Sequence, residues 1–226
     1  MTALFVTATG TDIGKTFVTA GLIRALRRAG RMVDAAKPVI SGFTLEALGA
    51  SDTGILLSAL GRDLCAEEAA RISPWRFTAP LSPDMAAEAE GTAIDFDALV
   101  GDSRARIAAA QDVLLIEGVG GIMVPLDDRH TVLDWMDALG LPLLLVAGSY
   151  LGTISHTLSA LDVLARRGLQ VPALVISETP GSTVGLAPTI ATLRRFVPAD
   201  VEILGLPRLA VGQDHPAFDR LAGLIT

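Results

Sequence analysis

Cysteine and lysine are scarce in this chain of 226 residues. The single cysteine, Cys65, excludes an internal disulfide framework and a zinc site made of several cysteines, and we interpret it as a small, partly buried apolar residue. Only two lysines are present, Lys15 and Lys37, because arginine carries all the other positive charge. Both lysines are therefore candidates for a specific role.

Long apolar runs and basic segments are also missing. The longest apolar run, 139–147, is far shorter than the roughly 20 residues that a membrane span needs. The N-terminal residues lack the basic region of a signal peptide. A net charge of −7 argues against nucleic acid or an anionic membrane as the main partner. We expect a soluble, cytoplasmic protein.

The composition is that of a folded α/β domain. Half of the residues are hydrophobic and 19% are charged, which excludes disorder. A chain of this length is enough for one well-filled domain and short for two, so we expect a single domain over residues 1–226.

Apolar runs alternate with helical patterns along the chain. The runs that favour strands are 3–7, 32–39, 112–117, 142–147, 171–177 and 201–205. The patterns that favour helices are 15–29, 52–61, 97–110, 153–167, 184–196 and 215–224. Most of the runs are continuous rather than alternating, as in parallel strands covered on both faces. The order predicts a doubly wound, mostly parallel sheet in a three-layer α/β/α arrangement.

One stretch, 72–92, breaks this rhythm. Its first half carries three prolines and two aromatic residues. We expect an ordered loop that forms the wall of a pocket or an interface.

The segment Thr9–Thr16 carries a phosphate-binding pattern between the first strand and the first helix. It reads T-G-T-D-I-G-K-T, one letter away from G-x-x-x-x-G-K-[ST]. In such a loop Lys15 reaches the β- and γ-phosphates and the Thr16 hydroxyl binds Mg²⁺. The pattern has glycine where Thr9 stands, so we expect Gly10 to supply the permissive turn. An ordinary glycine-containing turn is the alternative, and it leaves Lys15 unexplained.

Two other strand ends carry charged residues. Lys37 lies near the end of the second strand and Glu117 ends the third, where Gly118 to Gly121 follow with three glycines. Asp52 stands in the first turn of a predicted helix, where capping alone could explain it. Because ligands of open α/β sheets bind at the carboxyl ends of strands, we expect these groups to share one site for phosphoryl transfer.

No hydrolytic triad can be argued from the sequence. His130, His156 and His215 are scattered, and we interpret each as structural. The predicted chemistry therefore depends on positioning and charge stabilisation rather than on a histidine base.

Taken together, these motifs resemble the dethiobiotin synthetase family almost from end to end. The chain carries T-D-x-G-K-T-like residues at Thr11–Thr16, K-P-V-x-S-G at Lys37–Gly42 and E-G-x-G-G at Glu117–Gly121. Pro125-Leu126, the pair Asp134-Trp135 and the phrase F-x-x-P-x-S-P at Phe77–Pro83 also fit. A P-loop NTPase-like fold is implied.

The resemblance implies a ligase of biotin biosynthesis that uses ATP and Mg²⁺. The substrate 7,8-diaminononanoate reacts with CO2 to give a carbamate. A carbamate oxygen then attacks the γ-phosphate, and the second amine closes the ureido ring and expels phosphate.

The resemblance also implies roles for individual residues. Lys15 and Lys37 are catalytic, and Thr16, Asp52 and Glu117 surround Mg²⁺. The substrate faces Thr11, Asp12 and Ser41, and in a homodimer it also meets Leu151, Gly152 and Thr153 of the second copy. The nucleotide-binding residues are Asp12, Ile13, Gly14, Lys15, Thr16, Phe17, Asp52, Glu117, Gly118, Val119, Gly120, Ser177, Glu178, Leu206, Pro207 and Arg208.

Two positions depart from the family pattern. Asp12 stands where family members often have glutamate, and Ser177 stands where an asparagine contacts adenine. An asparagine amide can pair with both a donor and an acceptor of adenine, whereas serine offers one hydroxyl, so selectivity for adenine is in question.

Two other functions are alternatives for a chain with this loop. A cobalamin-pathway synthetase shares the loop but normally adds a glutaminase domain, for which this chain has no room. A partitioning or septum-positioning ATPase carries a further lysine at the position of Thr9 or Gly10, and none is present.

Overall fold

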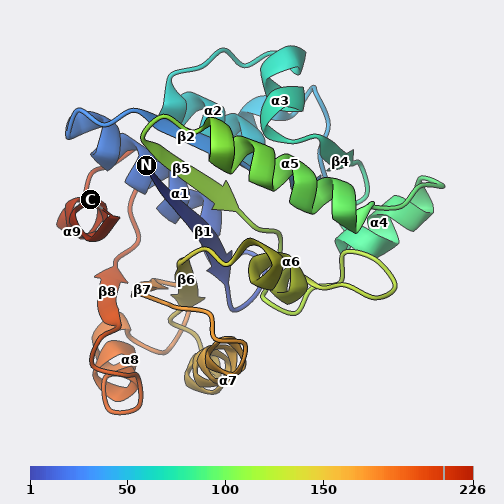
Figure 1. Cartoon of the computed structure of the whole chain (residues 1–226). Helices are drawn as coiled ribbons and strands as arrows, with labels where there is room; N and C mark the ends of the chain where they lie inside the picture. The colour runs from blue at the N-terminus through green and yellow to red at the C-terminus, as the bar shows by residue number, and fades with distance from the viewer. Residues whose placement is uncertain (211, 226) are drawn as a thin grey trace.

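The computed structural model describes residues 1–210 and 212–225, and its centre is a sheet of six parallel strands (Figure 1). Their order across the sheet is β2-β5-β1-β6-β7-β8. The strands are β1 (Thr2–Ala8), β2 (Val33–Ala36), β5 (Val113–Glu117), β6 (Leu143–Gly148), β7 (Ala173–Ser177) and β8 (Glu202–Leu206). The predicted doubly wound sheet is confirmed.

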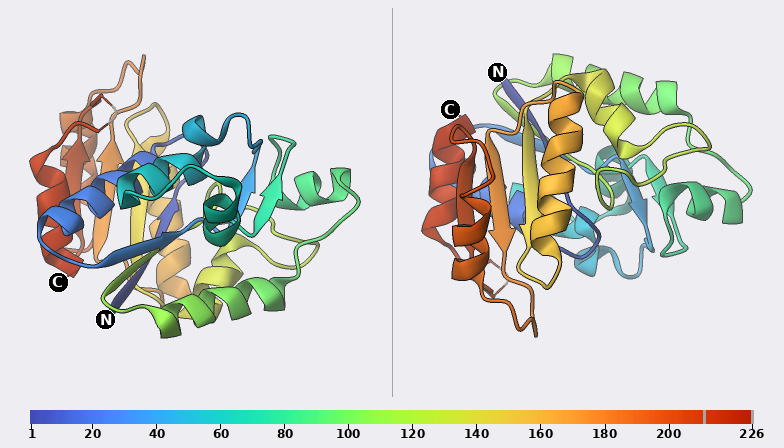
Figure 2. Two further views of the ribbon diagram at one scale, coloured as in Figure 1. Left: turned by 90° about the horizontal axis from the view of Figure 1, so that it is seen from above. Right: turned by 90° about the horizontal axis from the view of Figure 1, so that it is seen from below.

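Helices cover both faces of this sheet, as the two views in Figure 2 show. One face packs against α1 (Lys15–Arg28), α2 (Asp52–Leu60) and α9 (Pro216–Ile225). The other packs against α5 (Phe96–Ala109), α6 (Val132–Leu139), α7 (Thr153–Arg166) and α8 (Leu186–Leu193). The sheet therefore separates two hydrophobic clusters in a three-layer fold.

Strand β1 shows why the predicted strands are apolar without interruption. Leu4 and Val6 join the cluster under α1, whereas Ala3 and Phe5 join the cluster under α5 and α6. Successive side chains point to opposite faces of the sheet, and both faces are covered by helices and buried from water. Phe5 also meets Trp135 edge to face, with ring centroids 4.8 Å apart.

The predicted strand at 32–39 is wrong in its second half. Strand β2 ends at Ala36, and β3 (Val39–Ser41) leaves the main sheet to pair with β4 (Trp75–Phe77) in a small parallel sheet. Pro38 has no N–H to donate to a ladder, so the chain turns away there. This turn places Lys37 between the two sheets.

The predicted loop at 72–92 is also wrong. It contains β4 and the helix α4 (Pro83–Ala89), whose first position is a proline that tolerates the missing N–H. The short elements η1 (Leu48–Ala50) and α3 (Ala66–Ile72), together with α6, were not predicted.

All six main strands run in the same direction, so their carboxyl ends meet at one edge. The residues that follow β1, β2 and β5 therefore lie close together although they are far apart in sequence. No helix in the described part of the chain is long and apolar enough to cross a membrane.

Candidate active site

The loop between β1 and α1 is shaped by two left-handed residues. Asp12 has φ 57° and Gly14, directly before the helix, has φ 98°. Neither Thr9 nor Gly10 has a positive φ, so the prediction that Gly10 supplies the permissive turn is wrong. Aspartate tolerates the left-handed region better than most residues, which lets the chain turn at Asp12.

Gly121 lets the loop after β5 approach the phosphate-binding loop closely. A Cβ added at Gly121 would lie 3.2 Å from the Gly10 Cα and from the Thr9 carbonyl oxygen, whereas a Cβ added at Gly10 would meet the Ile13 side chain of its own loop at 3.1 Å. The missing side chain at Gly121 therefore lets the two loops approach backbone to backbone.

Glu117 is the buried centre of the site. It ends β5 with no exposed surface. Its Oε1 accepts a hydrogen bond from Thr16 Oγ1 at 2.7 Å and one from Lys37 Nζ at 2.8 Å. Its Oε2 is buried and has no hydrogen-bond partner in the described part of the chain. One carboxylate oxygen is thus satisfied, and the other is a buried polar atom without a partner among the described residues.

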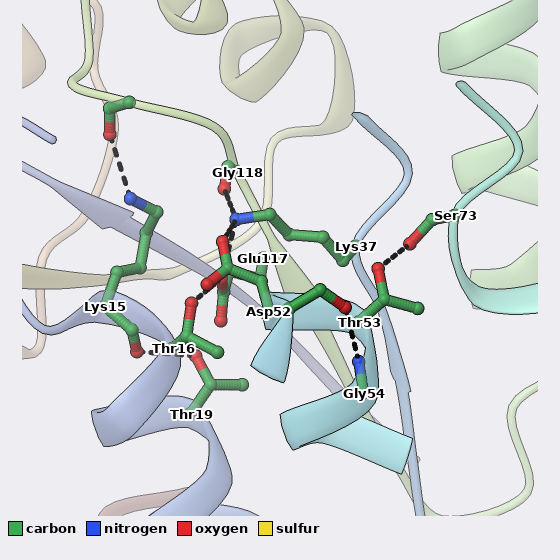
Figure 3. A network of polar contacts seen from close by, with 12 residues as sticks. Lys15, Thr16, Thr19, Lys37, Asp52, Thr53, Gly54, Ser73, Glu117 and Gly118 are labelled. Carbon is green, nitrogen blue, oxygen red and sulfur yellow. Dashed lines mark hydrogen bonds and ion pairs between the residues drawn. The ribbon is translucent and has the colours of Figure 1, made fainter. Parts of the chain in front are cut away.

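Lys37 joins the carboxylates of Glu117 and Asp52, as Figure 3 shows. Its Nζ lies 2.8 Å from Asp52 Oδ2 and donates to the Gly118 carbonyl oxygen at 3.1 Å. Burial works to lower the pKa of Lys37, but the charges and hydrogen bonds of Glu117 and Asp52 outweigh it and raise the pKa. Lys37 therefore stays charged although it is 2% exposed.

Lys15 is the second buried cation. Its Nζ donates to the Gly120 carbonyl oxygen at 3.0 Å (Figure 3). Burial, with the nearby charge of Lys37, lowers the pKa of Lys15 to about 8. An anion placed at this site would relieve both costs.

Asp52 is positioned by the start of α2. Ser51 caps this helix, since its Oγ accepts from Gly54 N–H at 3.1 Å. Burial works to raise the pKa of Asp52, but the charge of Lys37 prevails and the pKa is lowered. The carboxylate is therefore ionised and faces the same cation as Glu117.

The oxygen atoms of Thr16, Asp52 and Glu117 fit a magnesium ion. Mg²⁺ prefers oxygen ligands and is held by one or two carboxylates together with phosphates and water. The unpartnered Glu117 Oε2 is an oxygen of this kind. No cluster of three or more His, Cys, Asp or Glu side chains suited to a metal occurs among the described residues, so a cage made only of such side chains is not present there.

A cavity of about 810 Å³ is lined by Lys15, Thr16, Lys37 and Asp52, whereas the buried Glu117 is not among its lining residues. The predicted substrate residues Thr11, Asp12 and Ser41 line it, together with both lysines. The 72–92 segment, predicted to form the wall of a pocket or an interface, forms one wall of this cavity. Its individual lining residues were not predicted, and they are Pro80, Leu81, Ser82, Pro83 and Met85. Five further lining residues were not predicted: Ile40, Gly42, Ala50, Ser51 and Val124. Ile40 and Gly42 lie within the K-P-V-x-S-G motif, which was the signal that could have found them.

The other predicted nucleotide-binding residues lie in the cavity, in the hydrophobic core or at the ends of β7 and β8. Phe17, Val119 and Gly120 line the cavity, whereas Ile13 packs against the hydrophobic core. Ser177 does not line the cavity, but its Oγ would be 2.9 Å from a Cβ added at Gly14.

Next to Ser177, the ends of β7 and β8 are joined by a hydrogen bond. Glu178 Oε2 accepts from Arg208 N–H at 2.7 Å. Leu206, which faces Ser177 across the ladder, is buried in the core, and Pro207 follows it. These residues lie together beside the phosphate-binding loop, outside the main cavity.

Residues Leu151, Gly152 and Thr153 lie outside the cavity formed by the same chain. Leu151 is 86% exposed, and Gly152 has φ 98° directly before α7. Thr153 is buried and its Oγ1 donates to the Gly148 carbonyl oxygen at 2.7 Å.

The three histidines have partners outside the cavity. His130 stacks on Phe96 and its Nδ1 lies 2.8 Å from Asp127 Oδ2. The Nδ1 of His156 is hydrogen-bonded with Tyr150 Oη at 2.8 Å, and that of His215 accepts from Ala217 N–H. None of them lines the cavity, which agrees with the structural interpretation.

Comparison with known proteins gives a consistent result. A family model described as an AAA domain matches residues 2–211. An ATP-dependent dethiobiotin synthetase of Acidiphilium cryptum is 49% identical over 200 residues, which is 88% of this chain and 90% of that protein. The enzyme of the same name from Caulobacter vibrioides is 48% identical over 209 residues, or 92% and 93% of the two chains.

Solved structures resemble the fold at low sequence identity. The cell division ATPase MinD of Pyrococcus furiosus is 18% identical with a TM-score of 0.57, covering 100% of this chain and 98% of that one. MinD in a MinC:MinD complex of Aquifex aeolicus is 13% identical with a TM-score of 0.53, covering 97% and 86%. These similarities support the P-loop NTPase fold alone.

Proposed function

Because the chain belongs to the dethiobiotin synthetase family, we propose that the site around Lys15, Lys37 and Glu117 closes the ureido ring of dethiobiotin. The protein is an ATP-dependent ligase of biotin biosynthesis. One amine of 7,8-diaminononanoate combines with CO2 to give a carbamate. A carbamate oxygen attacks the γ-phosphate of ATP and expels ADP, which leaves a carbamic-phosphoric anhydride. The second amine then attacks the activated carbon and releases phosphate.

The observation that carries the proposal is the convergence of the only two lysines on one cavity. Lys15 and Lys37 come from different elements, both are buried, and both line the cavity. Carbamate and the transferring phosphoryl group are anionic, so fixed cations stabilise the charge that they bring together. Asp52 and Glu117 keep Lys37 charged and hold its Nζ in place.

Thr16, Asp52 and Glu117 are proposed to hold Mg²⁺. The ion would neutralise charge on the phosphate oxygens when bound. The chain itself contributes the hydroxyl of Thr16, which Glu117 orients by hydrogen bonding, and the unpartnered Oε2 of Glu117.

The diamine is proposed to lie along the wall of the cavity. Thr11, Asp12 and Ser41 offer polar groups to the amines, and Pro80, Leu81 and Met85 form an apolar surface that suits the aliphatic chain. Among the described residues that line the cavity, Lys15 and Lys37 are the cations, and neither is left for the distant carboxylate. We assign that carboxylate to the N-terminus of α7, from Leu151 to Thr153, in the second copy of a homodimer.

The nucleotide base is proposed to lie between the ends of β7 and β8. Ser177 and Glu178 follow β7, and Leu206 to Arg208 follow β8. All five residues belong to the same single ATP-binding domain, because the two hydrophobic clusters share one sheet.

The partitioning or septum-positioning ATPase is not favoured. Its likeness to this chain is one of fold, and the extra lysine early in the loop is missing.

The test is phosphate release from ATP with 7,8-diaminononanoate and bicarbonate, together with the mass of the product. We expect release that requires both substrates and a product with the mass of dethiobiotin. Release that does not depend on the diamine, or that only DNA or lipid stimulates, would contradict the proposal. Running the same assay with ATP, GTP and CTP measures how selective the enzyme is for the nucleotide base with serine at position 177. Equal turnover with all three nucleotides would indicate low selectivity for adenine.

A further inference from the structure

Two neighbouring segments at the carboxyl edge of the sheet are joined by a reciprocal pair of hydrogen bonds. Ser149 N–H donates to Thr179 Oγ1 at 3.1 Å, and Thr179 N–H donates to Ser149 Oγ at 3.1 Å. Ser149 follows β6 and is fully buried, while Thr179 follows β7, the next strand of the sheet. Each side chain therefore satisfies a backbone group of the other segment.

The contact is tight because Gly148 has no side chain. A Cβ at Gly148 would lie 2.6 Å from Thr179 Oγ1 and 2.8 Å from the ring of Tyr150. The Gly148 carbonyl oxygen accepts from Thr153 Oγ1 at 2.7 Å. Two threonine hydroxyls thus hold the turn of residues 148–153, one at each end.

This turn leads into α7, which lies beside β6 in Figure 1. Thr153 N–H donates to the Tyr150 carbonyl oxygen at 3.0 Å, and Gly152 precedes the helix with φ 98°. No side chain caps the helix, and its first turn carries no acidic residue. The geometry of residues 149–152 therefore fixes where the first backbone N–H groups of α7 are presented.

We propose that Thr179 is a positioning residue for the carboxylate of the diamine. Its hydroxyl holds the turn of residues 149–152 and, through it, the α7 N-terminus that serves the active site of the second copy. The inference rests on the proposed function, which assigns this N-terminus to the carboxylate. Thr179 acts through the turn and does not touch the reacting atoms.

Loss of this hydroxyl has a specific consequence. The buried Ser149 N–H loses its acceptor, so the turn moves toward other partners. Lys15, Lys37 and Glu117 stand on other elements and keep their contacts. Binding of the carboxylate should therefore weaken while the phosphoryl-transfer step keeps its rate.

The experiment compares Thr179→Val with Thr179→Ser, which keeps the hydroxyl. We expect the KM for 7,8-diaminononanoate to rise about tenfold in the valine variant, since misplacement of a binding group by a fraction of an ångström weakens binding on this order. Its kcat and its KM for ATP should stay within about twofold of the parent enzyme, and Thr179→Ser should restore the parent KM.

Thr189→Val is the matched control. Thr189 is buried, and its Oγ1 donates to the Gly185 carbonyl oxygen at 2.8 Å, but it lies on α8. This variant loses a buried hydroxyl without touching the turn, so its KM for the diamine should equal that of the parent. If Thr189→Val raises this KM as much as Thr179→Val does, the positioning role is refuted.

The neutral analogue 7,8-diaminononanamide separates positioning from general damage. It has an amide in place of the carboxylate, so the parent and Thr179→Val should show the same KM for it. An unchanged KM for the diamine in Thr179→Val overturns the inference, and so does an equal rise for the diamine, the amide and ATP.

Two further outcomes are covered. If Thr179→Val does not fold, Ser149→Ala removes the acceptor of the second hydrogen bond and takes its place in the same comparison, with the same results expected. A parent enzyme that releases no phosphate with the diamine overturns the proposed function. An active parent whose variants bind the diamine normally overturns only the role of Thr179.

Discussion

Lys37 carries one positive charge and has two negatively charged partners, Asp52 and Glu117. Two carboxylates lie 2.8 Å from its Nζ, and the Gly118 carbonyl accepts a third contact. A buried cation of this kind is costly unless its partners are fixed, and Asp52 and Glu117 are fixed by α2 and β5. The site therefore presents a fully charged ammonium without letting it move.

The first prediction separates the charge of Lys37 from its structural role. Lys37→Met should lower kcat by about 10²- to 10³-fold, the usual effect of removing one group that stabilises transition-state charge. It should also lower the free energy of unfolding by about 3 kcal/mol or more, because Glu117 is left buried and unpaired. Steady-state kinetics and urea unfolding measure the two effects.

The double variant Lys37→Met/Glu117→Gln is the control for this prediction. It removes the unpaired charge, so it should recover most of the lost stability and none of the activity. Activity stays lost in this variant because Glu117 is itself a proposed magnesium ligand, so the comparison concerns stability. A double variant as unstable as Lys37→Met would show that the loss does not come from the unpaired Glu117.

The second prediction concerns Lys15 and pH. Its pKa is about 8 in the folded protein and near 10.5 in the unfolded chain, so the folded state disfavours the charged form. The penalty is fully present below pH 8 and disappears as pH rises toward 10.5. At about 1.4 kcal/mol per pKa unit, and with about 1 kcal/mol returned by the bond to Gly120, Lys15→Met should stabilise the protein by about 2 kcal/mol at pH 7.

Urea unfolding of the parent and Lys15→Met at pH 7 and pH 10 measures this effect. The advantage of the variant should shrink strongly at the higher pH. An advantage that is equal at both pH values, or a variant less stable at pH 7, would show that Lys15 is not strained by burial.

At the scale of elements, the site depends on the loops after β1 and β5. The missing side chain at Gly121 lets the two backbones meet, and Lys15 Nζ bridges the loops through the Gly120 carbonyl. The phosphate-binding loop is thus braced by the loop that follows Glu117.

The third prediction tests this brace. Gly121→Ala should raise the Kd for ATP about tenfold, because its Cβ would lie 3.2 Å from backbone atoms of Thr9 and Gly10 and would force the phosphate-binding loop to shift by a few tenths of an ångström. Gly101→Ala is the matched control, since Gly101 lies in α5 with nothing within 4 Å of the added Cβ. That change should leave the Kd unchanged and stabilise the protein by about 0.5–1 kcal/mol. Calorimetric titration with ATP measures the Kd of both variants. Equal Kd values for Gly121→Ala and Gly101→Ala would contradict the claim that the loop after Glu117 braces the phosphate-binding loop.

The sequence predicts the elements whose signals are local. The strands from β1 to β8 in the main sheet follow from continuous apolar runs, and α1, α2 and α7 follow from their periodicity. It fails for β3, β4 and α4, because pairing of Val39 with Trp75 depends on a contact between distant segments. Prolines also read as loop residues, although Pro83 begins a helix.

The same limit applies to the site. The strand-end rule brings Lys37 and Glu117 to one edge, but their hydrogen bond depends on the pairing of β2 with β5. The left-handed Asp12 and the apolar lining by Met85 depend on the packed loops and leave no pattern in the sequence.

At the scale of the whole molecule, the proposed site needs two copies of the chain. The cavity holds both lysines, whereas Leu151 to Thr153 lie outside it. The fourth prediction mixes two inactive variants, Lys37→Met and Gly152→Val, the second of which strains a residue with φ 98°.

A mixed dimer has one site with both defects and one with neither. Random exchange of subunits should therefore restore about a quarter of the parent activity, since half of the dimers are mixed and each has one intact site. Subunits are exchanged at equal concentration, and dimers are confirmed by sedimentation. No recovery in confirmed mixed dimers would place both parts of a site in one chain.

The most direct test of the account follows an oxygen atom. If a carbamate oxygen attacks the γ-phosphate, one oxygen of the released phosphate comes from CO2. With 18O-labelled bicarbonate, 7,8-diaminononanoate and unlabelled ATP, mass spectrometry should find one 18O in each phosphate released. Phosphate without label, formed together with dethiobiotin, would contradict the proposed attack of the carbamate on ATP.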